Sequence, residues 1–408
     1  MSAEIRVVAS EDEFRSFLEV DAVCFAGEVR EEQVALAHAF LEADRTMGAF
    51  VGGRLVGTCA NLTMEVTVPG PASLACAGVS WVSVLPSHRR QGILTAMMRR
   101  LLDDTVAHGE PLAVLLASES AIYGRFGYGQ ATQAATYEID KAHAALAHRP
   151  ETGGAIRVLM PDEASTTLPA IHEANRRLYA GGSRRWEGWW ADRLFDAEAD
   201  RGGASRMYHA VHEPVGGAPD GYLTWRVEER WDKNPANLAA VIECSGATDA
   251  VRLALVEFAC NLDLIGRVQL RSFPVDEPVR WALAEPRQLA TRAVYDVLWV
   301  RMLDVERCLA ARTYGVADRL VIDVEDGFRP ECGGRFALDS RSGASCGRTD
   351  EPPDLSVTVS DLGALYLGGV SAATLAAAGR LRPLTPGVVG RATRLFATER
   401  APYGDTEF

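Results

Sequence analysis

The sequence predicts an α/β (α+β) protein in which two mixed-sheet units that carry helices precede a smaller α+β unit. Three observations predict this fold class. At about 150 residues per domain, a chain of 408 residues predicts two or three domains. Apolar runs of strand length alternate with segments of helical period, and this order occurs twice before the texture changes near Trp299. We therefore expect domains over residues 1–150, 151–297 and 298–408.

The first unit opens with the run IRVVAS, which predicts a strand. Ser10 and Glu13 then have the spacing of a capping box, and apolar residues at helical period follow, so a helix is predicted over 11–24. The remaining elements complete a mixed sheet with helices on it. They are a hairpin that turns at Gly52–Gly53, a buried strand over 78–86, a helix from about Gly92 and a buried strand over 111–118.

A linker at 145–155 separates a second unit that repeats this order in weaker form. Its turn SGATDA (245–250) has neither the arginines nor the glycine spacing found before the helix of the first unit, so we interpret the second unit as a degenerate duplication. The third unit combines strands such as DRLVIDVED with helices such as VVGRATRLFA. The expected elements of the second unit are strands over 156–160, 207–212, 221–229, 238–244 and 267–272 and helices near 162–178 and 249–260.

The chain carries a net charge of −13, which argues against a nucleic-acid partner because phosphate binding needs a basic face. An acidic chain suits a cationic or amine-bearing partner better. The N-terminal segment lacks the apolar core of a signal peptide, and the least polar long window, 355–379, carries Asp361 and a glycine pair. We expect one short strand and two short helices in this window, no membrane span, and a cytoplasmic protein.

The eight cysteines are spread along the chain without a C-x-x-C pair, and several lie in apolar surroundings. This pattern is typical of buried free thiols in a reducing compartment. The histidines are scattered as well, so no metal site is predicted. The segment 343–347 matches the G-x-S-x-G spacing of a nucleophile elbow. Polar segments flank it where that motif needs a strand and a helix, so we predict a polar hairpin turn there.

The stretch SHRRQGILTAMMRRLL (87–102) places Arg89, Arg90 and Gly92 between a buried strand and a helix. A helix N-terminus presents unpaired N–H groups and a partial positive charge, and glycine lets the backbone approach a bulky anion. The spacing therefore suits a pyrophosphate. A basic loop that caps a helix on a solvated face fits the same spacing, and the spacing alone does not decide between the two.

Several further segments, taken with this turn, resemble the Eis (enhanced intracellular survival) family of GNAT acetyltransferases. The turn is similar to the acetyl-CoA motif [R/Q]-x-x-G-x-[G/A], with Leu94 at the last small position. The resemblance covers essentially the whole chain. It implies two tandem GNAT-like mixed-sheet domains, of which only the first is catalytic, followed by a sterol-carrier-protein-like α+β domain. The other matching segments are ASESAIYGRFGYG (117–129), LYLGG (365–369), TLAAAGRL (374–381) and the C-terminal EF.

The resemblance also implies roles for individual residues. Tyr123 is the expected general acid, the α-carboxylate of Phe408 is the expected general base, and Tyr128 is expected to be structural. The residues expected to bind acetyl-CoA are Val82, Ser83, Val84, Arg90, Gln91, Gly92, Ile93, Leu94, Thr95, Ser118 and Glu119. Each acid or aromatic in the acceptor site also suits an ordinary ion pair or core packing. The candidates to hold a cationic acceptor are Phe25, Glu28, Trp81, Asp296 and Glu407.

These features predict an acetyl-CoA-dependent N-acetyltransferase that acts on primary amines of small polycationic molecules, either aminoglycoside-like compounds or polyamines. The expected mechanism is direct attack of the amine on the thioester, which requires neither a metal nor an acyl-enzyme. The resemblance implies a hexamer. Two alternatives stay open: a protein-lysine acetyltransferase, and a lipid- or sterol-binding carrier whose GNAT units are vestigial. The intact turn at Gly92 argues against the carrier, because a vestigial turn should look like SGATDA.

Overall fold

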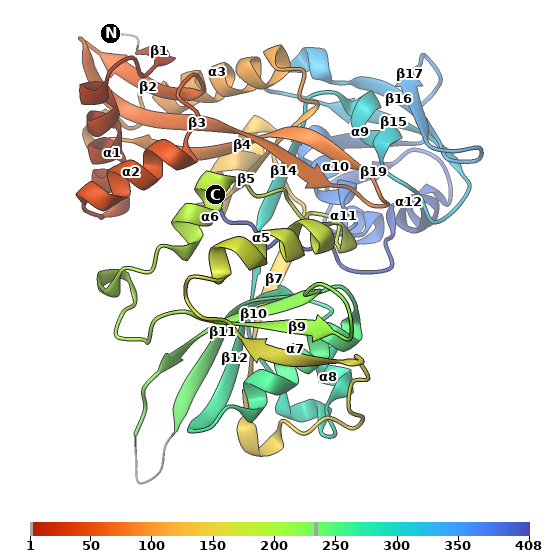
Figure 1. Cartoon of the computed structure of the whole chain (residues 1–408). Coiled ribbons are helices and arrows are strands. Elements are labelled where there is room, and N and C mark those ends of the chain that lie inside the picture. Colours follow the sequence, from red (N-terminus) through yellow and green to blue (C-terminus); the bar gives the residue numbers. More distant parts are fainter. Residues whose placement is uncertain (1–2, 232–235) are drawn as a thin grey trace.

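The computed structural model describes residues 3–231 and 236–408 and contains three β-sheets with helices packed against them (Figure 1). Two sheets of seven strands are built mostly from the N-terminal three quarters of the chain, and a five-stranded sheet forms the C-terminal unit. Within the described residues, no helix is both long and apolar enough to cross a membrane. The window 355–379 forms a short strand and two short helices, as the sequence predicts.

The first sheet has the strand order β1-β2-β3-β4-β5-β14-β6. Helices α1 (Glu11–Phe25) and α2 (Glu31–Phe40) cover one face, and α3 (Ile93–Ala107) covers the other with its apolar stripe (Figure 1). The structure confirms the predicted helices at α1 and α3, whereas α2 has no predicted counterpart. The strands are β1 (Glu4–Val7), β2 (Thr46–Val51), β3 (Arg54–Thr67), β4 (Ser73–Val84), β5 (Leu112–Leu116), β14 (Leu298–Met302) and β6 (Gly129–Gln130).

The second sheet has the order β13-β7-β12-β11-β10-β9-β8. Helix α7 (Asp249–Asn261) packs on one face, and α5 (Ala164–Asn175) contacts both the sheet and α6 (Glu187–Leu194). The short helix α8 (Val279–Ala282) follows the sheet's central strands. The strands are β13 (Ala290–Asp296), β7 (Gln133–Asp140), β12 (Ile265–Pro274), β11 (Asn237–Gly246), β10 (Gly221–Glu228), β9 (Tyr208–Pro214) and β8 (Gly154–Val158).

The two large sheets exchange strands, so sheet membership crosses the expected domain boundaries at 150 and 297. Strand β7 precedes the linker yet lies in the second sheet, and β14 follows the second unit yet pairs with β5 and β6 in the first. At the crossing, the backbone N–H groups of Ala131 and Thr132 both donate to the carbonyl of Leu298. The two sheets are therefore joined along two crossing segments, and the boundaries stay a prediction about folding units.

The third sheet has the order β17-β16-β15-β18-β19, and its helix α10 (Val359–Tyr366) also packs against β6 and β14 of the first sheet. Ser345 begins the short edge strand β17 and is exposed, so the G-x-S-x-G segment is not a strand-to-helix elbow. The strands are β15 (Arg319–Glu325), β16 (Gly334–Asp339), β17 (Ser345–Arg348), β18 (Leu355–Thr358) and β19 (Leu381–Pro383). The other helices are α9 (Val305–Ala311), α11 (Ala372–Ala377) and α12 (Val388–Phe396).

Candidate active site

Strand β4 carries a bulge where it parts from β5. The parallel pairing of the two strands ends at Gly78 opposite Val114, while β4 continues to Val84 beside β3 alone. The register with β3 shifts so that Trp81 and Val82 lie opposite one residue, and Trp81 takes a φ of 54°. The backbone edge of β4 that faces away from β3 is therefore left without a strand partner beyond Gly78, as far as the structure describes the chain.

The turn before α3 leaves the helix N-terminus open. Gly92 is the N-cap with a φ of 81°, and a Cβ built on it would meet no atom within 4 Å. Arg90 is also left-handed, with a φ of 62°. No acidic residue lies in the first turn of α3. No carboxylate of that turn therefore offsets the partial positive charge of the unpaired N–H groups. This cradle fits an anion that approaches the backbone closely.

A cavity of about 420 Å³ lies between this turn, the free edge of β4 and the end of β5. It collects every residue expected to bind acetyl-CoA except Gln91, whose side chain lies 3.5 Å from the Ser87 carbonyl. His88, Arg89, Ile122 and Arg125 add to its walls. The sequence motif therefore brings its members together in space, and the adjacent cations raise the positive potential of the site.

Tyr123 and Tyr128 lie close together but in different surroundings. Tyr123 ends the short helix α4 (Ser120–Tyr123) and lines the cavity of about 420 Å³, whereas Tyr128 is fully buried behind it with ring centroids 6.1 Å apart. Burial and the Glu119 charge raise the pKa of Tyr123 against a smaller opposing effect of Ser118, so the phenol is protonated at neutral pH. Tyr123 thus places a protonated phenol at the cavity wall, and Tyr128 is a core residue.

A second cavity, of about 750 Å³, adjoins the first and contains all five residues expected to hold the acceptor. Phe25 lines both cavities, so the two adjoin at this side chain. Asp296 accepts a 2.7 Å hydrogen bond from Trp299, and Glu407 lies 3.8 Å from Arg193. Both acids therefore have protein partners as well as a place in the cavity wall.

Three carboxylates in this larger cavity were not predicted, Asp21, Asp192 and Asp405, and the last of these pairs with Arg185. Asp21 and Asp192 both line it, and burial raises the pKa of each, that of Asp21 to about 6. One Asp21 oxygen is buried without a hydrogen-bond partner among the described groups. Asp21 follows Phe14, Phe17 and Leu18 at helical spacing, so the period of the buried stripe of α1 could have revealed it. Asp192 lies on α6, a helix that the sequence did not predict.

The C-terminal tail runs from the third unit across the second sheet to the acceptor cavity, and Figure 1 shows the C-terminus beside α6. Tyr403 is buried and fixed by its amide to Ala180 and by its hydroxyl to Ser272. The Phe408 ring packs against β4, where it would lie 3.1 Å from a Cβ placed on Gly78. Phe408 therefore ends the chain inside the cavity wall, at the strand whose free edge lines the neighbouring cavity.

Comparisons with known proteins agree with this arrangement. Models of the acetyltransferase (GNAT) domain match residues 4–131 and 181–302, and the sterol carrier protein domain matches 305–404. These matches confirm the fold class. A GCN5-related N-acetyltransferase structure from Anabaena variabilis, 19% identical with a TM-score of 0.85 over the full length of both chains, has the same fold.

Relatives of higher identity match the chain from end to end. An uncharacterized N-acetyltransferase of Streptomyces avermitilis is 38% identical over 99% of both chains, and the N-acetyltransferase Eis of Mycobacterium tuberculosis is 33% identical over 96% of both. The crystal structure of Eis1 from Mycobacterium abscessus is 36% identical, with a TM-score of 0.90 over 99% of this chain and 100% of that one. The chain therefore belongs to the Eis family of GNAT N-acetyltransferases, enzymes that use acetyl-CoA.

Proposed function

We propose that this enzyme transfers the acetyl group of acetyl-CoA to a primary amine of a small polycation, either an aminoglycoside-like compound or a polyamine, by direct attack. The observation that carries the proposal is the acidic cavity of about 750 Å³, which adjoins the cavity at the α3 N-terminus. Asp405 and Glu407 pair with arginines, whereas Asp21 is mostly buried and has an oxygen without a hydrogen-bond partner among the described groups. Such a buried carboxylate is costly unless a cation is bound beside it. The acids in its wall are Asp21, Glu28, Asp192, Asp296, Asp405 and Glu407.

The residues of the smaller cavity divide the binding of acetyl-CoA among them. The N–H groups at the start of α3, with Arg89 and Arg90, suit the pyrophosphate. The free edge of β4 at 82–84 suits the amides of the pantetheine arm and can polarise the thioester carbonyl. Leu94, which stands where the motif has a small residue, is half-buried against the core beneath α3 and also lines the cavity.

Proton transfers at two groups complete the reaction. The α-carboxylate of Phe408 accepts a proton from the acceptor ammonium, which frees the nitrogen lone pair for attack on the carbonyl carbon. As the carbon–sulfur bond breaks, Tyr123 donates its phenol proton to the departing thiolate. Direct attack needs no cysteine nucleophile. Cys59, Cys76, Cys244 and Cys308 are buried away from the two cavities, and burial raises their thiol pKa values, whereas Cys24 lines the smaller cavity.

A panel of amines tests this proposal. The enzyme is incubated with acetyl-CoA and one of four acceptors: an aminoglycoside, spermidine, a lysine-containing peptide or an amino sugar with a single amine. Thiol release and product mass are measured. We expect polycations to be acetylated with the highest kcat/KM. Preference for the lysine peptide would favour the protein acetyltransferase, and a panel with no acetylated amine would contradict the proposal.

The third unit does not resemble an open lipid carrier. The guanidinium of Arg312 is buried at its centre, where it donates to the carbonyls of Tyr366 and Phe396. Tyr366, Phe396 and Phe336 are buried around the same core. Because side chains fill this interior, we do not adopt the carrier. Vesicle-to-vesicle transfer of a fluorescent sterol tests this alternative.

We also propose a hexamer in the cytoplasm. The family resemblance supports the hexamer. All eight cysteines are free, which supports a reducing compartment. Light scattering coupled to size-exclusion chromatography measures the assembly, and a monomeric mass would contradict it.

A further inference from the structure

One buried guanidinium holds the last residues of the chain. Arg185 lies just before α6, and its side chain is completely buried. Its Nε donates to Thr406 Oγ1 at 3.2 Å, and its Nη2 donates to the Asp405 carbonyl at 2.9 Å and lies 3.3 Å from Asp405 Oδ1. Its Nη1 donates to Glu243 of β11 at 2.5 Å. Arg185 therefore connects the second sheet to two consecutive residues of the tail.

Neighbouring aromatic residues extend this anchor toward Phe408. The Arg185 guanidinium carbon lies 4.0 Å from the ring centroid of Trp189, a cation–π distance. The indole N–H of Trp189 in turn donates to the Glu407 carbonyl at 2.5 Å. Residues 405, 406 and 407 are thus each tied to Arg185 or to the ring it stacks on, and only Phe408 extends beyond them.

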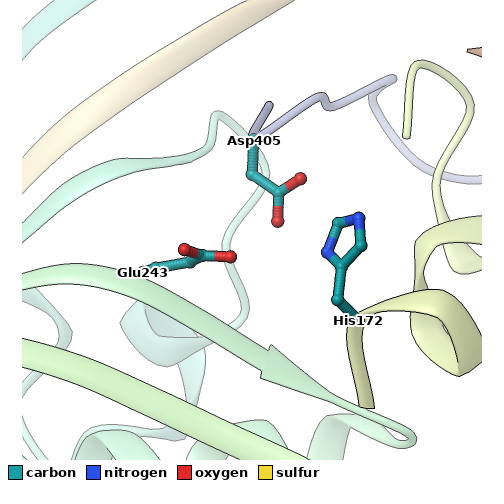
Figure 2. Close-up of side chains that lie close together, drawn as sticks. All are labelled: His172, Glu243 and Asp405. Atoms are coloured by element: carbon teal, nitrogen blue, oxygen red, sulfur yellow. The ribbon is translucent and has the colours of Figure 1, made fainter. Parts of the chain in front are cut away.

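Figure 2 shows that His172, Glu243 and Asp405 converge on one point, with ligand atoms within 4.8 Å of one another. Such a trio could hold a metal ion by itself. Here the Arg185 guanidinium already donates to the Glu243 carboxylate and forms an ion pair with the Asp405 carboxylate at 3.3 Å, and His172 Nε2 lies 2.9 Å from the Ser183 carbonyl. Burial and the Arg185 charge lower the pKa of His172, so the ring is neutral. The two carboxylates therefore bind a protein cation, and we interpret the cluster as a tail anchor.

The anchor holds the last residues of the tail but does not set the path by which the tail reaches the second sheet. Tyr403 is held separately, by Ala180 and Ser272, so the tail reaches the second sheet without Arg185. From Asp405 onward, however, the contacts converge on Arg185 and Trp189. Loss of the guanidinium would also leave the Glu243 and Asp405 carboxylates facing each other, with only Arg193, 3.7 Å from Glu243, to offset their repulsion.

We propose that Arg185 is a positioning residue that fixes the α-carboxylate of Phe408 beside β4 at the acceptor. This inference rests on the proposed role of that carboxylate as the general base. A displacement of a reacting group by about 1 Å can lower the rate about 10²-fold, so a residue that never touches the substrate can control turnover. Acetyl-CoA binding should not depend on it, because Arg185 contacts neither α3 nor the free edge of β4.

The test uses the full-length enzyme with Arg185→Gln, Arg185→Lys and the matched control Arg45→Gln. Arg45 is equally buried between two carboxylates, Asp104 and Glu110, but its side-chain hydrogen bonds go to Asp104, Glu110 and Thr63 and not to the tail. We expect Arg185→Gln to lower kcat about 10²-fold, with an unchanged acetyl-CoA dissociation constant and faster release of Phe408 by carboxypeptidase A. Arg185→Lys, which keeps the charge, should recover part of kcat. The folded control should keep both kcat and its terminus.

Combination with deletion of Phe408 separates this inference from the proposed function. If Arg185 acts through the tail, Arg185→Gln should not lower kcat any further in a chain that already lacks Phe408. If the two changes instead lower kcat by the product of their separate factors, Arg185 does not act through the tail, although the Phe408 carboxylate can still be the general base. Full activity after deletion of Phe408 alone would overturn the role of that carboxylate as the base. If Arg185→Gln does not fold, the double variant Asp405→Asn/Thr406→Val replaces it, because it keeps the Arg185–Glu243 pair and removes both contacts of Arg185 with tail side chains. Full kcat in that double variant would overturn the proposal.

Discussion

The first two units contain the same strand–helix–strand segment, with a different turn in each. In the first unit α3 connects the parallel strands β4 and β5, and in the second α7 connects the parallel strands β11 and β12. The N-terminus of α3 is open at Gly92 and has no acid in its first turn. At α7, Thr248 accepts a hydrogen bond from the Val251 amide, and Asp249 lies in the first turn.

The glycines of the two turns also differ in use. A Cβ on Gly92 would project into open space, whereas a Cβ on Gly246 would lie 2.8 Å from the Arg252 amide nitrogen. The second turn thus packs on its own helix, and its N–H groups are capped by the chain itself. The shared fold therefore does not decide which helix binds an anion. A helix N-terminus can bind one only where the chain itself has not already satisfied its N–H groups.

The largest expected effect concerns the general acid, because the first unit places Tyr123 in the wall of the smaller cavity, beside the open helix N-terminus. Tyr123→Phe should lower kcat by about 10²–10⁴-fold, because the thiolate then leaves without a positioned proton donor. Tyr128→Phe is the control, and it should cost far less because Tyr128 is buried outside the cavity. Equal losses in the two variants would contradict the assignment of roles within 123–129.

The next largest effect concerns the C-terminal tail, which the second unit holds against the first. Deletion of Phe408 should lower kcat by about 10²-fold or more, the usual contribution of a placed base, and leave the acetyl-CoA dissociation constant unchanged. Phe408→Ala keeps the α-carboxylate but loses the ring that packs at Gly78, so its kcat should be intermediate. A C-terminal tag that leaves full activity would rule out the role of the tail carboxylate.

A third prediction concerns a substitution in the open turn before α3. Gly92→Asp places a carboxylate at the α3 N-terminus and forces an L-residue into a φ of 81°, so acetyl-CoA affinity should fall about 10-fold or more. Ala250→Asp is the control, because an acid in the first turn of α7 suits that helix and should leave affinity unchanged. Isothermal titration of both folded variants measures this, and equal affinities would mean that acetyl-CoA binds elsewhere.

The comparison also predicts the binding stoichiometry. One acetyl-CoA should bind per chain, because the second turn is capped by Thr248 and carries Asp249. The number of sites from the same titration checks this. A value of two per chain would overturn the interpretation of the second unit as degenerate.

The smallest effect concerns Asp21, whose burial in the acceptor cavity raises its pKa from 3.8 to about 6. The native carboxyl keeps its proton to higher pH than the unfolded one, so stability declines as pH rises from about 4 to about 6. Above pH 6 the charged form costs up to about 3 kcal/mol. Asp21→Asn should therefore raise the melting temperature at pH 7.5 but not at pH 4, and weaken polyamine binding at pH 7.5. A lower melting temperature at pH 7.5 would contradict this account.

The candidate site was predictable where local signals define it. Ten of the eleven expected acetyl-CoA residues line one cavity, because they belong to three short segments that meet there: the end of β4, the turn before α3 and the end of β5. Gln91 is the exception because its side chain turns toward Ser87. Asp192 was missed because α6 has a short apolar pattern, with Trp189 and Trp190 adjacent instead of at helical spacing. Trp189 itself packs with Arg185 and holds the tail.

The sequence by itself determined the elements whose signals lie within a few residues. Ser10 caps α1 by accepting from the Glu13 amide at 3.3 Å, and Gly92 supplies the left-handed residue at which α3 begins. Only the tertiary structure decided that β7 and β14 exchange sheets and that the tail ends at β4 beside the acceptor cavity. Caps and periodicity depend on hydrogen bonds between near neighbours. The pairing of Leu298 with Leu116 and the contact of Arg185 with Asp405 join distant residues, and their stability comes from burial that no local pattern records.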